Sequence, residues 1–515
     1  MPDYLRPLVV IAGIATVVFL VLQNSFSPLM PPGAYQRRRN AFFALTAFAF
    51  LAPGFWFYAV AATLVVIPAS RRETNTPALF FALLFAVPPA AQQIPGLGLV
   101  NFLIALDHPR LLALLLLLPA ALVVHRNARS PATRWPDRIF FAYILLQAIL
   151  ELSRSASVTS GVRGVAYLFI DAVLPYYVVS RAFTSMGQLK DAATTFCLAG
   201  AVLGAIGIFE SGKGWLLYRA PLDRWPTDFA LGNYLMREGF LRATASTGHP
   251  LVLGFVLMIA LTCFLAVREW MRPGLPRKLT CVLLLGGLVA TLSRGPWLGA
   301  VAAVVVFWAT ANAVRARIGI AVAVLAGLAY LFDTQLPFLS KLGGIDRATV
   351  DYRAELFSKS MQLFMERPWL GSDEYVQRLA EMGMVQGQGI VDIVNTYLGV
   401  ALSSGVLGLT FFLGVFTIVL REIWIARRQY THNKAHTLPR DAAYGSTSKS
   451  QGEPPSVQAT LLGRVLLASL LGTLVTIGTT SSISVIPWVY WAWIGMSVAY
   501  VHLADRKAIE PLDSS

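Results

Sequence analysis

The sequence predicts an all-α polytopic membrane protein, because apolar runs long enough to cross a bilayer recur along its whole length. Of 515 residues, 56% are apolar and only 13% are charged, whereas soluble domains carry about 25% charged residues. The mean hydropathy is +0.61. One long polar segment, Asp333 to Asn395, interrupts the apolar runs late in the chain. We expect about 12–14 transmembrane helices and one long external loop.

The apolar runs place these helices in order along the chain. The predicted spans lie near residues 7–23, 41–67, 77–90, 110–124, 138–152, 164–181, 190–209, 249–267, 278–292, 297–313, 317–332, 395–420, 462–480 and 484–503. Pro53 and Gly54 interrupt the second run. Residues 91–108 hold Pro95, Gly96 and Gly98, which favour an interfacial or re-entrant piece over a span.

The basic residues predict the orientation, because cytoplasmic loops are enriched in Lys and Arg. Basic loops lie at Arg71-Arg72, 126–138, 268–278, Arg315–Arg317 and 421–464, all on one side of the predicted spans. We take that side as cytoplasmic and expect both termini there. The opposite, external side receives residues 153–163, 210–248, 293–296 and 333–394. Arg37-Arg38-Arg39 also falls outside by this count, and the sequence does not explain it.

The sequence excludes several classes of function. Its net charge of +15 lies in the loops between spans, as expected for a membrane protein, so we expect no nucleic-acid binding. Cys197, Cys263 and Cys281 lie inside apolar runs without metal or redox spacing. No HExxH, P-loop, GxSxG or CxxC motif occurs, and no cleavable signal precedes the first run. We expect no cofactor and no metal.

The long polar segment is predicted to be a folded cap on the external face. Leu356, Met361 and Phe364 recur at roughly helical spacing, and Tyr352 and Trp369 add aromatic side chains. A loop of this length is functional or disordered as a rule. The apolar positions favour a folded cap.

Four arginines lie where external loops meet predicted helices: Arg163, Arg242, Arg294 and Arg353. Any one of them could simply snorkel to lipid headgroups. Arg242 and Arg294 together, beside a polar cap, favour binding of an anionic lipid-linked ligand, because the guanidinium fork suits pyrophosphate or carboxylate.

Candidate bases on this face are few. His249 precedes Pro250 at a helix start and could be either a base or a helix cap. The external carboxylates are those of Glu151, Asp346, Asp351, Glu355, Glu366 and Asp392, and any of them could act as a base if partly buried.

The order of these motifs resembles the bacterial O-antigen ligase and polymerase superfamily. The resemblance covers roughly residues 160–420 and rests on the following ordered set: Arg-x6-His-Pro at 242–250, Leu-Ser-Arg-Gly at 292–295, Asp-Tyr-Arg-Ala-Glu-Leu at 351–356, Arg-Pro-Trp-Leu-Gly at 367–371, and Asn-Thr-Tyr-Leu at 395–398 followed by Gly405 and Gly408.

This resemblance implies a membrane glycosyltransferase of GT-C-like architecture in the bacterial inner membrane, with its active site facing the periplasm. It implies a glycan donor linked to undecaprenyl pyrophosphate and no metal. Arg242 and Arg294 would bind the pyrophosphate, with Arg353 and Arg163 as further candidates. Tyr352, Asn395 and Tyr397 are further candidates in the loop motifs. The lipid bilayer and other polysaccharide assembly proteins would be partners.

The chain departs from the family pattern at two positions. Val394 stands where the family commonly has a histidine, and Ser403 stands where a glutamate is expected. Asp392 is therefore our candidate base, with Glu355 and His249 as alternatives. No strong base is required if the pyrophosphate leaves readily. The departures favour a polymerase of exopolysaccharide or O-antigen repeats over a ligase onto lipid A-core.

A different class remains open. A flippase for lipid-linked oligosaccharides would also have many helices, and should place charges in mid-span, of which Asp171 is one of few. The chain divides by these criteria into N-terminal helices (1–159), core helices with the arginines (160–332), the loop (333–394) and C-terminal helices (395–515) that include a cytoplasmic linker at 421–463.

Overall fold

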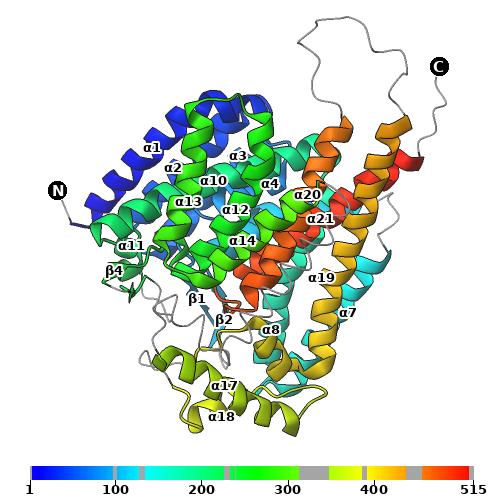
Figure 1. The fold of residues 1–515 in the computed structure, drawn as a ribbon. Coiled ribbons are helices and arrows are strands. Elements are labelled where there is room, and N and C mark those ends of the chain that lie inside the picture. The colour runs from blue at the N-terminus through cyan, green and yellow to red at the C-terminus, as the bar shows by residue number, and fades with distance from the viewer. Residues whose placement is uncertain are drawn as a thin grey trace, which may run out of the picture.

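The computed structural model is a helical bundle with a small helical cap at one end (Figure 1). It describes residues 3–96, 101–126, 134–225, 232–237, 239–311, 347–385, 391–436 and 455–509. Within these residues the predicted all-α polytopic fold is confirmed. Six helices are long and apolar enough to cross a membrane, and three further apolar helices are shorter. The number of twelve to fourteen spans stays a prediction.

The helices follow one another in this order: α1 (Arg6–Phe26), α2 (Ala34–Leu51), α3 (Phe55–Arg71), α4 (Thr76–Leu83), α5 (His108–Leu112), α6 (Leu118–Arg126), α7 (Arg134–Arg154), α8 (Val158–Leu168), α9 (Leu174–Ala182), α10 (Met186–Lys213), α11 (Arg219–Arg224), α12 (Pro250–Trp270), α13 (Leu275–Ala290), α14 (Arg294–Ala309), α17 (Arg347–Glu366), α18 (Tyr375–Glu381), α19 (Thr396–His436), α20 (Pro455–Ile477) and α21 (Ile486–Ile509). Single π-helical turns, Ala113–Leu117 and Phe169–Val173, join α5 to α6 and α8 to α9.

Two short antiparallel hairpins complete the fold. The strands β1 (Gln92–Pro95) and β2 (Phe102–Leu106) form the first, and β3 (Met236–Arg237) and β4 (Phe240–Leu241) form the second. The expectation that residues 91–108 do not span the membrane is therefore correct for the part described. The second hairpin carries Arg237 and leads directly into Arg242.

Helices α10 and α12 form the centre of the bundle. In the most apolar window of α12, 94% of the residues are buried, so this helix faces protein on all sides. Small residues allow the close packing: a Cβ at Gly204 of α10 would lie 2.2 Å from the carbonyl oxygen of Leu283 on α13. Close approach at small residues is how membrane helices gain packing energy.

The second predicted span, 41–67, is wrong, because the chain forms two helices there. α2 ends at Leu51, and α3 begins at Phe55 after the Pro53-Gly54 break and returns to the starting end. Arg38 near the beginning of α2 consequently bonds Glu73, which follows α3. α2 has 18 residues and α3 has 17. Together they occupy the apolar run from which one long span was predicted.

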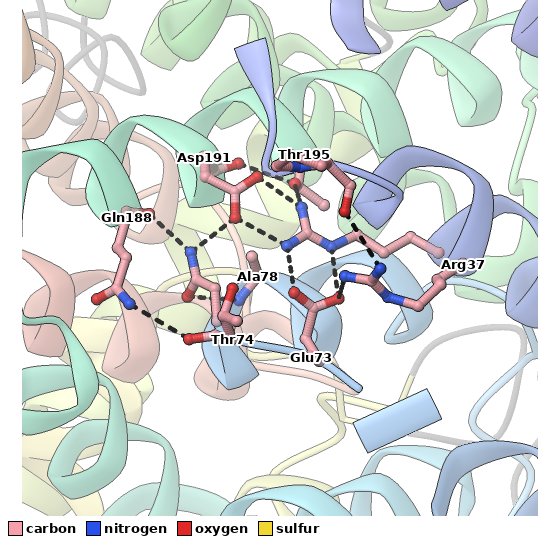
Figure 2. A network of polar contacts seen from close by, with 10 residues as sticks. Arg37, Glu73, Thr74, Ala78, Gln188, Asp191 and Thr195 are labelled. Atoms are coloured by element: carbon pink, nitrogen blue, oxygen red, sulfur yellow. Dashed lines mark hydrogen bonds and ion pairs between the residues drawn. The ribbon is translucent and has the colours of Figure 1, made fainter. Parts of the chain in front are cut away.

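This hairpin also explains the position of the cluster Arg37-Arg38-Arg39. Arg38 donates to both carboxylate oxygens of Asp191 on α10, at 2.7 and 2.8 Å, and to Glu73 (Figure 2). Asn75 donates 2.8 Å to the same Asp191 carboxylate. The cluster lies at the beginning of α10, on the same end as Arg71 and Arg72. A buried ion pair needs this degree of polar satisfaction to be tolerated.

The expectation that both termini share one side is also wrong. Tyr4, just before α1, lies under the guanidinium of Arg224 on α11, 4.4 Å from its centre. Arg224 also donates 2.6 Å to the carbonyl of Phe50 at the end of α2. The chain therefore enters at the end that carries α11 and β4, whereas α21 ends opposite (Figure 1). The additional reversal at Pro53-Gly54 adds one helix to the predicted sequence of spans, and the N-terminus therefore lies at the other end of the bundle.

Two further boundaries differ from the prediction. The span near 77–90 ends early, at Leu83, because Pro88 and Pro89 cannot continue a helix. The linker predicted at 421–463 is shorter, because α19 continues to His436 and α20 begins at Pro455. Arg427 lies on this helical extension and donates a hydrogen bond of 2.7 Å to the carbonyl of Thr310. It therefore belongs to a helix and not to a linker. The part of the linker at 437–454 lies outside the described residues.

The predicted cap is confirmed over 347–385. Helices α17 and α18 lie across the end of the bundle (Figure 1). Leu356, Leu363 and Leu379 form a small apolar core with Met384 and with Leu402 on α19. The backbone at Trp369 docks on Gly405, where α19 kinks at a positive φ of 66° and where a Cβ would lie 2.2 Å from the Trp369 carbonyl carbon. Residues 333–346 lie outside the described part.

Candidate functional site

Four segments that lie far apart in the sequence meet beneath the cap. They are the β3–β4 hairpin with the loop to α12, the turn between α13 and α14, the residues before α19, and the loop between α20 and α21. Hydrogen bonds join the first segment to the second and the third to the fourth. A contact between Gly295 and Thr479 joins the second to the fourth. We take this junction as the candidate site.

Arg242 lies against the turn that precedes Arg294. Its Nε donates 3.2 Å to the carbonyl of Thr291, and its Nη2 donates 2.9 Å to the hydroxyl of Ser293. Ser293 is the residue before α14, and Arg294 is the first residue of that helix. The two arginines predicted to act together are thus brought to one place.

Arg237 is a third arginine at this turn, and the sequence analysis missed it. Its Nη1 donates 2.5 Å to the carbonyl of Leu292. The hairpin turns at Gly239, whose φ of 81° favours glycine, and so brings Arg237 back toward Arg242. A glycine between two nearby arginines, in Arg-Glu-Gly-Phe-Leu-Arg at 237–242, was the signal available.

The guanidinium groups are crowded. Burial and the charge of Arg237 lower the pKa of Arg242 to about 10, and the carboxylate of Asp392 opposes this shift. Arg242 is still protonated at neutral pH, but burial and the charge of Arg237 destabilise its charged form. An anion bound between these arginines would stabilise that form again, so the site favours a negatively charged ligand.

A buried carboxylate holds the arginine loop in place. Glu210 near the end of α10 is fully buried and accepts hydrogen bonds from the backbone amides of Leu217, Thr244 and Ala245, at 2.8 to 2.9 Å. Three amide donors satisfy the carboxylate. Since Thr244 follows Arg242 by two residues, Glu210 fixes the backbone from which Arg242 extends.

Asp392, the candidate base, lies at the same junction. Its Oδ1 accepts a hydrogen bond of 3.0 Å from the hydroxyl of Ser481 in the α20–α21 loop, and Ser481 also donates 2.7 Å to the carbonyl of Ile393. Tyr352 of the cap donates to the carbonyl of Asp392 at 3.4 Å. Burial and the Asp392 charge raise the pKa of Tyr352.

The α20–α21 loop is a second feature that the sequence analysis missed. It carries the run Thr-Thr-Ser-Ser-Ile-Ser at 479–484. Thr480 accepts from both the amide and the hydroxyl of Thr396, at 3.1 and 2.8 Å. The signal available in the sequence was the run of hydroxyl residues between two predicted spans. The run was overlooked because it is short.

Backbone strain is concentrated at this end of the protein. Ala245, Leu292 and Ser484 are the non-glycine residues with positive φ within the described part of the chain, at 44°, 47° and 53°. One lies in the Arg242 loop, one in the α13–α14 turn and one in the α20–α21 loop. Strain of this kind, about 1–3 kcal/mol for each residue, is characteristic of functional sites.

His249 acts as the cap of α12. Its Nδ1 accepts a hydrogen bond of 3.2 Å from the amide of Leu251. Burial, together with the charge of Arg242, lowers its pKa to about 4, so the imidazole is neutral at pH 7 and is a weak base. Of the two possibilities left open by the sequence, the cap is the one that the geometry favours.

The remaining candidates divide into two groups. Arg353 lies on α17, and its Nε is buried without a hydrogen-bond partner among the described residues. Arg163 instead donates to the carbonyls of Leu103 and Phe102 on β2, at 3.1 and 2.7 Å, and stacks on the Phe102 ring. It ties α8 to the first hairpin.

Three loop candidates have local structural contacts. Glu355 is exposed and pairs with Lys359 at 2.5 Å, one turn away on α17. Asn395 caps α19 by accepting from the amides of Tyr397 and Leu398. Tyr397 donates 2.6 Å to the carbonyl of Leu474 on α20. These local contacts explain the three residues structurally, without a role in the reaction.

The mid-span charge considered for a flippase is paired. Arg110 donates to both oxygens of Asp171, at 2.7 and 3.0 Å, and stacks on Tyr167. Within the described residues, no group of three or more His, Cys, Asp or Glu side chains could hold a metal. The groups that meet at the candidate site are guanidinium, hydroxyl and carboxylate groups, a set suited to binding phosphate and transferring a proton.

Two comparisons with known proteins show what the chain is similar to. Residues 279–413, which include Arg294, Arg353 and Asp392, match the family model described as O-antigen ligase. The chain is also 28% identical over 333 residues to a protein of Pseudomonas aeruginosa named O-antigen ligase, an alignment that covers 62% of this chain and 74% of that protein. The resemblance predicted from the sequence is confirmed: residues 279–413 match the O-antigen ligase family model, and a relative with that name aligns with 62% of the chain.

Proposed function

We propose that this protein transfers a glycan from undecaprenyl pyrophosphate to a sugar hydroxyl at the capped face, which we take as periplasmic. The observation that carries the proposal is the convergence of Arg237 and Arg242 on the turn that begins α14 at Arg294. The match to the O-antigen ligase family model supports glycan transfer, and the arginines supply what a pyrophosphate donor requires.

In the proposed reaction the acceptor hydroxyl attacks the anomeric carbon of the donor glycan. The bond from that carbon to the pyrophosphate breaks, and its electron pair passes to the oxygen that leaves with undecaprenyl pyrophosphate. Fixed guanidinium groups stabilise the charge that develops on this oxygen. The proton of the hydroxyl passes to a carboxylate, for which Asp392 is the candidate, oriented by Ser481. Attack from the face opposite the pyrophosphate would invert the anomeric centre.

The proposal favours a polymerase of exopolysaccharide or O-antigen repeats, because Val394 and Ser403 replace the histidine and glutamate expected in the family motif. The second candidate, a ligase that moves a finished glycan onto lipid A-core, is supported by the name of the Pseudomonas aeruginosa relative. Both reactions use the same donor chemistry. They differ in the acceptor and hence in the product that accumulates when the protein is lost.

Gene deletion in the source bacterium, followed by sizing of surface polysaccharide and of lipid-linked intermediates, separates these candidates. Short single-repeat products indicate a polymerase, and full-length glycan left on undecaprenyl pyrophosphate indicates a ligase. Normal glycan would exclude both.

Complementation with variants tests the arginine site. Arg242→Ala and Arg294→Ala should each abolish the product at normal protein levels, and lysine should rescue poorly because it lacks the planar fork. Wild-type product from both alanine variants would overturn the pyrophosphate site. Asp392→Asn should lower the rate of transfer and leave donor binding intact. An unchanged rate would exclude Asp392 as the base.

A further inference from the structure

A pocket opens on the capped face, at the side of the bundle where α7 ends. It is lined by Gln147, Glu151 and Arg154 of α7, by Asp373 and Tyr375 at the start of α18, and by Ser403 of α19, and has a volume of about 280 Å³. This volume is close to the lower limit for small-ligand sites, which is about 300 Å³. None of the hydrogen bonds that define the arginine site involves these residues.

The walls of the pocket are held rigidly around it. Arg154 donates to the carbonyls of Ser403, Leu370 and Gly371, at 2.7 to 3.1 Å, and so joins α7, the cap and α19. Gln147 donates 2.9 Å to the hydroxyl of Ser404. The guanidinium is therefore occupied by carbonyls, and the pocket does not present it as a free cation.

The carboxylates, in contrast, are open to a ligand. Glu151 and Asp373 are both exposed, and neither carboxylate forms a hydrogen bond or ion pair with the described part of the chain. The Glu151 carboxylate lies over Gly164 of α8, where a Cβ would be only 2.1 Å from Oε1. Carboxylates, an amide, a hydroxyl and a tyrosine ring in one pocket suit the hydroxyl groups of a neutral sugar, whereas an anion would be repelled.

Large apolar side chains are exposed beside the pocket. Ile149 and Leu152 of α7 are about half exposed, and Trp369 of the cap is 68% exposed although its backbone is docked on α19. Exposed tryptophan is typical of the membrane–water interface. A ligand in this pocket would therefore have its sugars at the surface and an apolar anchor in the membrane.

The pocket is also within reach of the arginine site. The first helical stretch of α19 runs from Thr396, four residues after Asp392, to Ser403 in the pocket wall. Eight residues of helix correspond to roughly 12 Å. A glycan of a few sugars held at the pocket could extend its terminal hydroxyl toward Asp392.

We propose that this pocket binds the saccharide head of a membrane-anchored acceptor glycolipid. The proposal rests on the proposed function for its role as acceptor, but the binding itself does not. Both a lipid-linked repeat chain and a lipid A-core would present this chemistry. The same sugars could also be bound as free glycan, and the test distinguishes these two sources.

Binding is measured with the full-length protein in nanodiscs and two probes. One is the glycolipid fraction extracted from the source cells, and the other is the same glycan after mild acid has removed the lipid. We expect saturable binding of the glycolipid, at least tenfold tighter than that of the free glycan. The double variant Glu151→Gln/Asp373→Asn should weaken it at least tenfold. Gly164→Ala should weaken it too, because a methyl group there displaces the Glu151 carboxylate.

The matched control is Glu374→Gln, which changes the exposed carboxylate next to Asp373 that does not line the pocket; it should bind as wild type does. Equal affinity of the wild type and the double variant, or no saturable glycolipid binding by the wild type, would overturn the proposal. Tighter binding of free glycan would overturn the membrane-anchored ligand. Arg242→Ala should remove only the glycolipid binding that the double variant leaves, because donor lipids in the same fraction would bind at the arginine site. If that variant retains transfer, the proposed pyrophosphate site fails and the pocket stands.

Discussion

At the scale of single residues, the site depends on guanidinium groups that have different geometric tasks. Arg242 bonds the Thr291 carbonyl and the Ser293 hydroxyl, whereas Arg237 bonds the strained Leu292 between them. Each of the three residues before Arg294 thus has an arginine partner. Arg237 also makes Arg242 harder to keep charged, which a bound diphosphate would reverse.

We therefore expect Arg237→Ala to reduce transfer about 100-fold or more, the range found when one donor to a developing negative charge is removed. Arg237→Lys should recover little, because lysine cannot reproduce the fork. Initial rates with a lipid-pyrophosphate-linked donor measure the effect. Arg378→Gln, which removes an exposed arginine of the cap paired with Glu366, serves as the control. A rate for Arg237→Ala within threefold of that control would contradict the role.

His249 allows a separate prediction with a defined pH dependence. Its folded pKa of about 4 lies below the ordinary value of 6.5, so the unfolded chain binds the proton more readily. Stability should be complete above about pH 6.5 and should fall as the pH is lowered toward 4. His249→Asn keeps a capping side chain and removes this titration.

Thermal unfolding in detergent between pH 4 and pH 7 measures this difference. The wild-type midpoint should decrease more steeply with acidification than that of His249→Asn, and the variant should keep most of its transfer activity at neutral pH. Complete loss of activity in a folded His249→Asn protein would instead identify the imidazole as a catalytic base.

What the sequence predicts at this scale is uneven. The sequence predicts Arg242, Arg294 and Asp392 as site residues because each stands beside a span or within a family motif. Arg237 and Ser481 were missed because each reaches the site through a partner distant in the sequence: Arg237 through Leu292, and Ser481 through Asp392. Such a pairing depends on how the helices pack, which no local pattern contains. His249, which the sequence left open as a base or a cap, and Asn395, a further loop candidate, both cap helices.

At the scale of elements, the α13–α14 turn and the α20–α21 loop must touch for the site to form. Gly295 in the first turn of α14 makes this possible, because a Cβ there would lie 2.2 Å from the Thr479 hydroxyl oxygen. The glycine of Leu-Ser-Arg-Gly is thus explained by packing between two loops. Through Ser481, the same loop reaches Asp392.

Gly295→Ala should therefore separate the two elements and lower transfer at least tenfold, and Thr479→Ala in the same chain should restore a substantial part of it. Transfer rates of the two single variants and the double variant form the cycle that measures this coupling. Gly212→Ala is the matched control, since a Cβ at Gly212 of α10 meets nothing within 4 Å. Additive effects in the cycle, without rescue, would show that the contact does not limit the site.

Element types were predicted better than element ends. The long apolar runs identified α1, α10, α12 and α20 correctly. However, hydropathy alone could not distinguish one long span at 41–67 from the α2–α3 hairpin, because both arrangements contain the same apolar run. It also could not show that α19 continues past its apolar part to His436, since a helix needs no apolar surface where it extends into water.

At the scale of the whole molecule, the α2–α3 hairpin determines which end of the bundle the chain enters. The arginine cluster at the beginning of α2 and the site near the end of α10 lie at opposite ends of that helix: Asp191 and Glu210 are separated by nineteen residues, or about 29 Å. Positive charge that looked misplaced in the sequence is thereby returned to the face of the other basic loops, in agreement with the positive-inside rule. The same reversal moves Tyr4 to the face of the site.

This arrangement predicts the reactivity of single cysteines toward an impermeant thiol reagent in intact cells. After Cys197, Cys263 and Cys281 are replaced by serine or alanine, a cysteine at Tyr4 and one at Glu374 should both be labelled, because both lie at the capped end. A cysteine at Arg71 should be labelled only after the membrane is permeabilised, because it shares the end where Arg38 meets Glu73. Labelling of Arg71→Cys in intact cells, with protection of Tyr4→Cys, would invert the orientation. The arginine site would then be cytosolic, where a periplasmic glycan transfer could not take place.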